Sequence, residues 1–337
     1  MTVEGVEDLI AKHFGRRYCV LAGSGSTAIY LLLRAVGTDR RYVLMPSILC
    51  PAPLYAILGA GFYPIFCDVE PDSYRLSPPD AVARLTPDTG VLFVPHLFGD
   101  LMPRDRLYSL ARRHGLFLVE DAAQGAWWTP PVPGSATVVS FGWEKPLSAG
   151  WGGAVLTDQG QLAAQVRRLR DAFEPSTPKR LLHCPDGVPP PSAWLRPLVP
   201  SQLHRIVEAL ASWPRQSVRR RLLSRMYAHA LRHLDLRLPP EAHAPLWRFT
   251  VLLPNAAARS KVLMDLWRQG LSAWRMYPPL HVRWPGLYPQ AYSSPLPAAE
   301  DVGRRILNLV IDPEMTDEDV LRHALALEAS LKELTAT

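Results

Sequence analysis

Two residues of this sequence have the types and the order that one kind of chemistry requires. Lys145 ends the run SFGWEK, and Asp121 lies upstream of it in the run EDAAQ, directly after an apolar segment. A lysine amine forms a Schiff base with an aldehyde, and a carboxylate keeps a pyridine nitrogen protonated so that the ring accepts electrons. The pair therefore predicts a site for pyridoxal 5'-phosphate (PLP). Each residue alone has an ordinary explanation, as a solvated charge or as a helix cap.

A glycine- and serine-rich stretch near the N-terminus predicts a phosphate site. Residues 22–28 read AGSGSTA and lie between an apparent strand and an apparent helix. The N–H groups and the dipole at such a helix start favour a phosphate, although a simple turn is the alternative. The stretch also matches GxGxxA, but residues 43–47 (VLMPS) lack the acid that a dinucleotide fold uses to bind ribose. An oxidoreductase is the weaker alternative, and it predicts no adduct at Lys145.

The apolar segments predict the elements that position these residues. Short apolar segments alternate with helix-like segments over the first half of the chain, which predicts an α/β fold with a buried, mainly parallel sheet. The expected strands are 18–22, 42–45, 62–67, 90–95, 116–120, 136–141 and 153–157, and the helices are 26–36, 51–58, 103–114 and 159–172. Functional residues are then expected at the carboxyl ends of the strands.

Length and proline content predict two domains. A chain of 337 residues exceeds the usual size of a single core. A Pro-rich loop over 184–200 separates the sheet region from the rest. Two helices are expected after it, over 201–211 and 215–234, and a small α/β unit from the segments 247–253, 261–269 and 302–309. We expect a large PLP-binding domain over 1–235 and a small domain over 236–337.

Composition restricts the class of protein and its location. Hydrophobic residues make up 48% and charged residues 20%, as in ordinary globular proteins, and the net charge is +6. The basic run 215–225 has helical spacing and predicts a solvated helix face, not a nucleic-acid site. No CxxC pair or metal site is expected, and the cysteines indicate a reducing compartment. They are Cys19, Cys50, Cys67 and Cys184. Without a leader-like or membrane-length apolar run, we expect a cytoplasmic protein with no membrane segment.

The ordered motifs resemble the DegT/DnrJ family of sugar aminotransferases, PLP enzymes of the aspartate-aminotransferase fold, fold type I. The resemblance covers nearly the whole chain. Its segments are 24–28 (SGSTA), 45–47 (MPS), 61–69 (GFYPIFCDV), 94–99 (VPHLFG), 120–124 (EDAAQ), 140–145 (SFGWEK), 152–155 (GGAV) and 277–281 (YPPLH). The resemblance implies a large domain with a mainly parallel seven-stranded sheet and a homodimer with shared active sites. It also implies amino transfer from glutamate or glutamine to a keto-sugar or related small-molecule ketone in a biosynthetic pathway.

The resemblance also implies roles for single residues. Lys145 would hold PLP as a Schiff base and move a proton to and from the substrate carbon. Asp121 would pair with the ring nitrogen, and Gln124 would reach the ring hydroxyl or the phosphate side. His96 lies where the family commonly has a histidine near the ring, although a structural histidine is equally expected there. The phosphate is expected on small residues: Ser24, Gly25, Ser26 and Ser140.

Two departures from the family pattern concern the ring and the substrate. Cys50 stands beside the expected ring position, where the family usually has a stacking aromatic, which a tryptophan such as Trp127 or Trp128 can replace. The family's GxNxR segment, supplied by the partner subunit, has no recognisable copy. An anionic substrate group is instead expected on Arg196, Arg275 or Tyr277.

Two further hypotheses stay open. A PLP enzyme of this family can catalyse a reaction other than transamination, because one fold hosts many functions. A catalytically inactive binding or regulatory homologue is the second, suggested by the missing aromatic at Cys50. Retention of Lys145 argues for catalysis.

Overall fold

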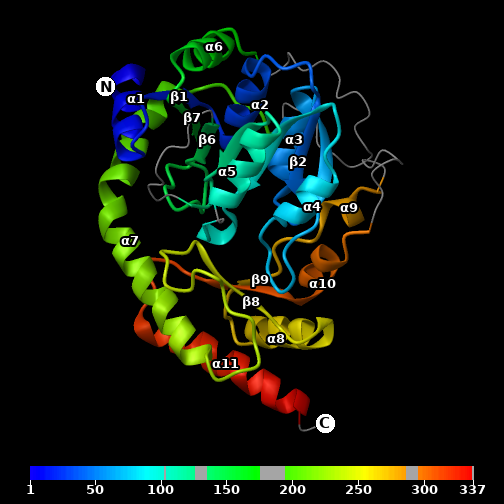
Figure 1. The fold of residues 1–337 in the computed structure, drawn as a ribbon. Helices are drawn as coiled ribbons and strands as arrows, with labels where there is room; N and C mark the ends of the chain where they lie inside the picture. The colour runs from blue at the N-terminus through cyan, green and yellow to red at the C-terminus, as the bar shows by residue number, and fades with distance from the viewer. Residues whose placement is uncertain (102–103, 126–134, 175–193, 286–294, 336–337) are drawn as a thin grey trace.

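A seven-stranded sheet forms the centre of the larger part of the protein (Figure 1). The computed structural model describes residues 1–101, 104–125, 135–174, 194–285 and 295–335. The strands are β1 (Tyr18–Ala22), β2 (Tyr42–Pro46), β3 (Tyr63–Cys67), β4 (Thr89–Pro95), β5 (Phe117–Asp121), β6 (Ser135–Ser140) and β7 (Gly153–Thr157). They follow the order β1-β7-β6-β5-β4-β2-β3. All neighbours are parallel except β7, which is antiparallel to β1 and β6. The prediction of an α/β fold with a mainly parallel sheet is confirmed.

Helices bury both faces of this sheet, which explains why its strands are apolar throughout. On one face lie α2 (Gly25–Ala35), α3 (Pro51–Gly59) and α6 (Gly160–Asp171), whose side chains share a core with Val119 and Val138. The other face packs against α1 (Val3–His13), α4 (Pro78–Ala83) and α5 (Arg104–Arg113). Alternate residues of a strand point to opposite faces, so the sequence of each strand must be apolar at every position.

The C-terminal part has its own small sheet and core. Its antiparallel strands have the order β8 (Arg248–Leu252), β10 (Ile306–Val310) and β9 (Ala273–Trp274). Four helices accompany them: α8 (Ala256–Arg268), α9 (Leu280–Arg283), α10 (Pro297–Arg305) and α11 (Asp317–Thr335). The segment 302–309 thus contains a helix end followed by a strand. The helices α1 and α11 have no counterpart among the segments expected from the sequence.

A single long helix joins the two parts, where two helices were predicted. Helix α7 (Leu203–Leu231) continues through Pro214, and Figure 1 shows it running along one side of the molecule. Proline removes one hydrogen bond of a helix, so the prediction of a break over residues 212–214 was wrong for a tertiary reason. The upper half of α7 packs Ile206 and Trp213 against the large sheet region, and the lower half packs Leu223 and Tyr227 against the small sheet.

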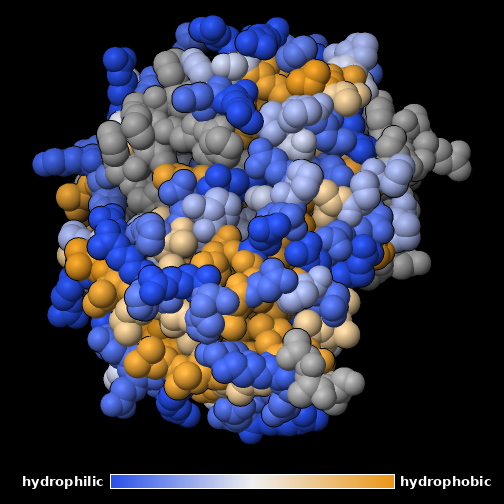
Figure 2. Space-filling model, turned by 60° about the horizontal axis from the view of Figure 1, so that its bottom comes forward, coloured by the Kyte–Doolittle hydropathy of each residue, from blue (hydrophilic) through white to orange (hydrophobic). Residues whose placement is uncertain are grey.

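The basic run of α7 is not the solvated face that the sequence predicted. Arg220 is only 5% exposed, whereas the apolar Val218 is 69% exposed. The prediction failed because the small sheet covers the side of the helix on which Arg220 lies. Apolar side chains are also exposed on the neighbouring α11, at Leu321 and Leu325, and Figure 2 shows apolar areas among polar ones on the face that includes the bottom of the molecule. Among the described residues, no helix combines the length and hydropathy needed to cross a bilayer.

Candidate active site

A small pocket at the carboxyl ends of β5 and β6 brings together most of the predicted residues. Asp121 ends β5 and Ser140 ends β6, while the N-termini of α2 and α3 approach from the same side. This is the edge of a parallel sheet at which ligands commonly bind. The predicted residues in the pocket wall are Gly25, Ser26, Cys50, Asp121, Gln124, Ser140 and Lys145.

Asp121 is a carboxylate in a sheltered position. Its residue is 7% exposed, and the N–H of Ala123 donates a 2.9 Å hydrogen bond to its Oδ1. Burial raises the pKa of the Asp121 carboxyl, while that hydrogen bond and the charge of Lys145 oppose the shift. A buried carboxylate is costly without a cationic partner. A protonated ring nitrogen is a cation that fits the position.

The C-terminal part holds the loop that carries Lys145. The Lys145 Nζ lies 4.9 Å from the centre of the Trp247 ring, within the range of a cation–π contact. The indole Nε1 of Trp247 donates a hydrogen bond to the Glu144 carbonyl, and its main-chain N–H donates to the Phe98 carbonyl at 2.7 Å. Glu144 has a left-handed φ of 60°, which turns the chain immediately before the lysine. The sequence analysis missed Trp247, whose one signal is its place just before a strand.

The start of α2 forms a cradle that fits a phosphate. A Cβ at Gly25 would lie 3.0 Å from the Ser140 Cβ and 3.2 Å from its Oγ, so glycine is needed for this close approach. The N-terminal N–H groups of α2 and the hydroxyls of Ser26 and Ser140 face the same small volume. A phosphate oxygen accepts from such donors. Ser24 does not line the pocket, because its Oγ caps α2 by accepting from the Thr27 N–H at 3.0 Å.

Gln124 and Tyr277 connect the large sheet to the C-terminal part. The Gln124 Oε1 accepts a 2.7 Å hydrogen bond from the Phe98 N–H, and its Nε2 donates to the Tyr277 hydroxyl at 3.0 Å. Tyr277 stacks on Phe98, with 5.8 Å between ring centres and 13° between planes. Burial raises the pKa of Tyr277 well above its ordinary value, so its hydroxyl is neutral. Cys50 opens α3 without a side-chain cap and leaves its thiol at the pocket.

Other predicted residues lie outside the pocket. His96 is buried, with its Nε2 3.3 Å from the Glu120 carboxylate. The Arg196 guanidinium lies 3.7 Å from the centre of the Trp151 ring. Arg275 is exposed and faces α8, where burial and then its charge lower the pKa of Arg259. Trp127, Trp128 and Cys184 lie outside the described residues.

Arg248 is a second residue that the sequence analysis missed. It is 6% exposed and lies between two aromatic rings, 4.4 Å from the centre of Trp247 and 4.6 Å from that of Trp274. Its Nη2 lies 3.4 Å from the Glu144 carboxylate. The adjacent letters WR before an apolar strand are the only sequence signal for this arrangement.

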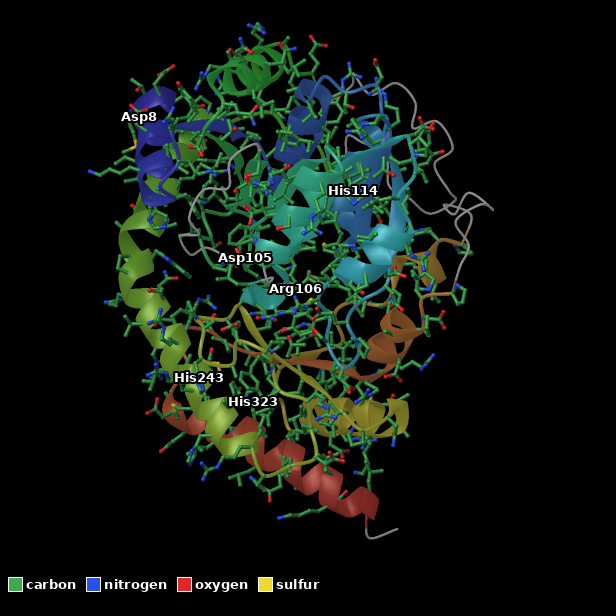
Figure 3. The ribbon with its side chains drawn as sticks, viewed as in Figure 1. Asp8, Asp105, Arg106, His114, His243 and His323 are labelled. Carbon is green, nitrogen blue, oxygen red and sulfur yellow. The ribbon has the colours of Figure 1, made fainter. Side chains whose placement is uncertain are left out.

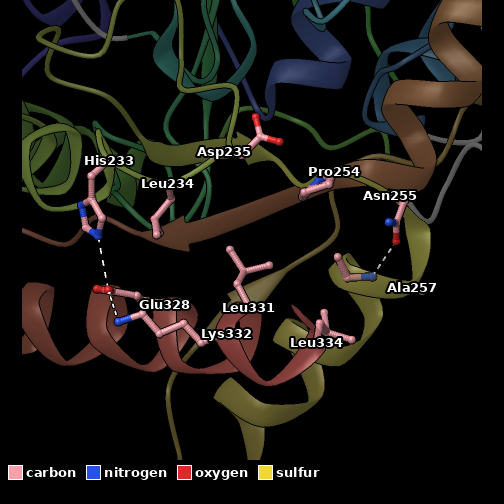
Figure 4. Close-up of a pocket in the computed structure, with 11 residues that line it drawn as sticks. His233, Leu234, Asp235, Pro254, Asn255, Ala257, Glu328, Leu331, Lys332 and Leu334 are labelled. Atoms are coloured by element: carbon pink, nitrogen blue, oxygen red, sulfur yellow. Dashed lines mark hydrogen bonds and ion pairs between the residues drawn. The ribbon is translucent and has the colours of Figure 1, made fainter. Parts of the chain in front are cut away.

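Two other hollows have different characters. Asp105, Arg106 and His114 of α5, labelled in Figure 3, line a groove beside α4. A second pocket lies between α8, α11 and the end of α7 (Figure 4), where the Glu328 carboxylate pairs with His233 at 3.3 Å and with Lys332 at 2.6 Å. Neither contains a residue predicted for the PLP site, and the charges of the second pocket already neutralise one another.

The fold and the pocket around Lys145 define a PLP-dependent enzyme of fold type I. The model of the DegT/DnrJ/EryC1/StrS aminotransferase family matches residues 1–185 and 200–327, and the chain belongs to this family of aminotransferases. The family and the cofactor expected from the motifs are therefore confirmed.

Individual proteins show the same relationship. The chain is 28% identical to GDP-perosamine synthase of Caulobacter vibrioides, over 96% of this chain and 89% of that protein. It is 39% identical to L-glutamine:2-deoxy-scyllo-inosose aminotransferase of Streptomyces fradiae, over 48% of this chain and 39% of that protein. The structure of S. venezuelae DesV in complex with a ketimine intermediate superposes with a TM-score of 0.83 at 29% identity, covering 97% of this chain and 89% of DesV.

Proposed function

We propose that this protein transfers an amino group from glutamate or glutamine to a keto-sugar or a related cyclic ketone. The observation that carries the proposal is the single pocket in which the Lys145 amine, the buried Asp121 carboxylate and the α2 N-terminus meet. The names of the relatives support the substrate classes, since one makes an amino sugar and another uses glutamine with a cyclitol ketone.

Each group of residues has a distinct task in this proposal. When bound, PLP supplies an electron sink for the bonds at the substrate carbon. Lys145 attaches to the cofactor and moves the proton at that carbon, and Asp121 holds the ring nitrogen protonated. The N–H groups at Gly25 and Ser26 and the Ser140 hydroxyl bind the phosphate. Tyr277 lies close enough to the Gln124 amide to orient a substrate hydroxyl or carbonyl.

The test is the visible spectrum of the purified protein with PLP, before and after borohydride reduction, with mapping of the modified peptide. We expect one reduced adduct, on Lys145, in wild type and in Lys12→Gln, an exposed control, and none in Lys145→Gln. A glutamate or glutamine challenge should bleach the PLP absorbance. An adduct that no amino donor changes would favour a different PLP reaction or an inactive regulatory homologue, and no adduct would refute the proposal.

We also propose a homodimer in the cytoplasm, with a large domain over 1–235 and a small one over 236–337. Trp143 and Trp151 flank the lysine loop and are 64% and 39% exposed, although large aromatic side chains usually avoid such exposure. A partner subunit covering them would complete the active site. Sedimentation equilibrium should give a dimer for wild type and a weakened dimer for Trp143→Arg.

A further inference from the structure

A second pocket also opens onto Lys145. It lies between the lysine loop, the middle of α7, the start of β8 and the turn after β10. Its wall combines cationic and neutral donors with aromatic surface: Lys145, Gln216, Arg220, Arg248, Ser272 and Trp274. Three acidic residues, Glu144, Asp312 and Glu314, lie at the same pocket. The roles proposed above use only Lys145 among these residues.

Two buried arginines face each other across this pocket without matching counter-charge. Arg220 and Arg248 are 5% and 6% exposed. Burial lowers the pKa of Arg220 to about 10; the charge of Asp312 opposes the shift and that of Arg248 adds to it. Like charges repel strongly where water is excluded. A buried arginine pair of this kind is unfavourable unless an anion neutralises it.

The protein itself supplies little of that neutralisation. Arg220 donates through Nη1 to the carbonyls of Ile311, at 2.8 Å, and Leu246, at 3.5 Å, and no ion pair of Arg220 occurs within the described residues. The Nε atoms of both arginines are buried and lack a partner in that same part of the chain. The carboxylate paired with Arg248, that of Glu144, is 72% exposed. Asp312 is exposed and accepts from the Glu314 N–H of its own turn.

We propose that this pocket binds a carboxylate of the amino-acid donor through Arg248 and Arg220, an inference that rests on the proposed function. Guanidinium groups bind carboxylates through paired, charge-assisted hydrogen bonds. Trp247 and Trp274 fix the plane of the Arg248 group. The Lys145 amine and the Arg248 guanidinium lie 4.9 Å and 4.4 Å from the centre of one Trp247 ring, so a donor held by Arg248 has its amino carbon beside the reactive lysine.

The experiment compares Arg248→Gln and Arg220→Gln with Arg219→Gln as the matched control. Arg219 is the neighbour of Arg220 on α7, but it pairs with the exposed Asp317. On the PLP-loaded enzyme, we expect both pocket variants to raise the KM for the donor about 10- to 100-fold, as loss of a charge-assisted hydrogen bond predicts. The KM for the acceptor and all constants of the control should stay unchanged.

A binding measurement separates this inference from the proposed function. Glutarate, a dicarboxylate without an amine, should quench tryptophan fluorescence in wild type and the control but not in the pocket variants, whereas the neutral glutaramide should have no effect. Binding of glutarate by an enzyme that fails to transaminate would retain the carboxylate site and reject the function. Equal glutarate binding in all variants, or a raised acceptor KM in place of the donor KM, would overturn the inference. If Arg248→Gln does not fold, Arg220→Gln alone decides.

Discussion

The Gln124 side-chain amide donates a 3.0 Å hydrogen bond to the hydroxyl of Tyr277, across 153 residues of sequence. Gln124 follows β5 of the large sheet, and Tyr277 belongs to the segment that follows β9 of the small sheet. The amide is fixed at its other end by the Phe98 N–H. The shape of the active site therefore depends on how the two sheets are held together, and not on the large sheet alone.

Tyr277→Phe removes this bond while keeping the ring that stacks on Phe98. We expect kcat/KM to fall about tenfold, because the loss of one hydrogen bond with a buried partner costs about 1–1.5 kcal/mol. Steady-state kinetics with a fixed donor checks the change. Tyr63→Phe, a substitution in β3 away from the pocket, should keep wild-type kinetics; equal effects of the two substitutions would contradict the role of the Tyr277 hydroxyl.

Asp121→Asn tests the electrostatic role of the buried carboxylate. The amide has nearly the same shape but cannot carry the negative charge that keeps a ring nitrogen protonated. We expect transamination to slow about 100- to 1,000-fold, the usual effect of losing a preorganised electrostatic contact, with the borohydride-reducible adduct at Lys145 retained. Asp158→Asn, at the Arg16 pair, serves as the control. An unaltered rate in Asp121→Asn would refute the assignment.

Cys50 should be the reactive thiol among the three described cysteines. It is partly exposed at the pocket, whereas Cys19 and Cys67 are buried, and burial raises the pKa of both of those thiols. Thiolates are the species that react with iodoacetamide. Peptide mapping after brief labelling should find the adduct on Cys50 before Cys19 and Cys67, and prior loading with PLP should slow it. Labelling that PLP does not affect would place the ring away from Cys50.

Protonation of His281 should destabilise the fold. The Nδ1 of His281 lies 2.5 Å from the Ser47 hydroxyl and its Nε2 lies 3.4 Å from the Glu300 carboxylate. Burial lowers the pKa of His281 below 6.5, against the opposing effects of Glu300 and Asp68, and Arg84 adds to the lowering. The unfolded chain therefore binds more protons between these two pKa values, so stability falls as pH drops from about 6.5 through the folded-state pKa.

Urea unfolding across this pH range checks the His281 prediction. The free energy of unfolding should lose part of its pH dependence in His281→Asn, but keep it in His233→Asn, which alters an exposed histidine. The difference between variants isolates His281, since the other titrating groups are common to all three proteins. Parallel pH profiles for wild type and His281→Asn would contradict the prediction.

Arg75 and Asp100 form a buried pair whose loss should be costly. Arg75 Nε and Nη2 donate to the two Asp100 oxygens at 3.0 Å and 2.6 Å, and Asp100 is 1% exposed. We expect Arg75→Met to lower the free energy of unfolding by about 3–5 kcal/mol, because it leaves a buried charge unpaired. Arg304→Met, which removes exposed ion pairs, should cost less than about 1 kcal/mol. Urea denaturation of both variants at neutral pH provides the comparison.

The sequence determined the large sheet and the cofactor pocket because both depend on local patterns. Each strand of that sheet is buried on both faces, so its residues form a continuous apolar run, and the observed strands begin and end within a residue of the expected ones. Lys145, Asp121, Ser140, Gly25 and Ser26 follow or precede these strands directly. Their meeting at one edge follows from parallel strands ending on the same side of the sheet.

The tertiary structure decided what crosses between the two sheets. The side chains of Trp247 and Arg248 reach the lysine loop, Tyr277 reaches Gln124, and α7 stays unbroken through Pro214. None of these contacts has a local signature, because each joins segments far apart in the chain. Arg220 shows the reason most clearly: helical spacing placed it on a polar face, but the packing of the small sheet against α7 buries it beside Arg248. Burial of a single position depends on what lies opposite in space, and only the folded chain contains that information.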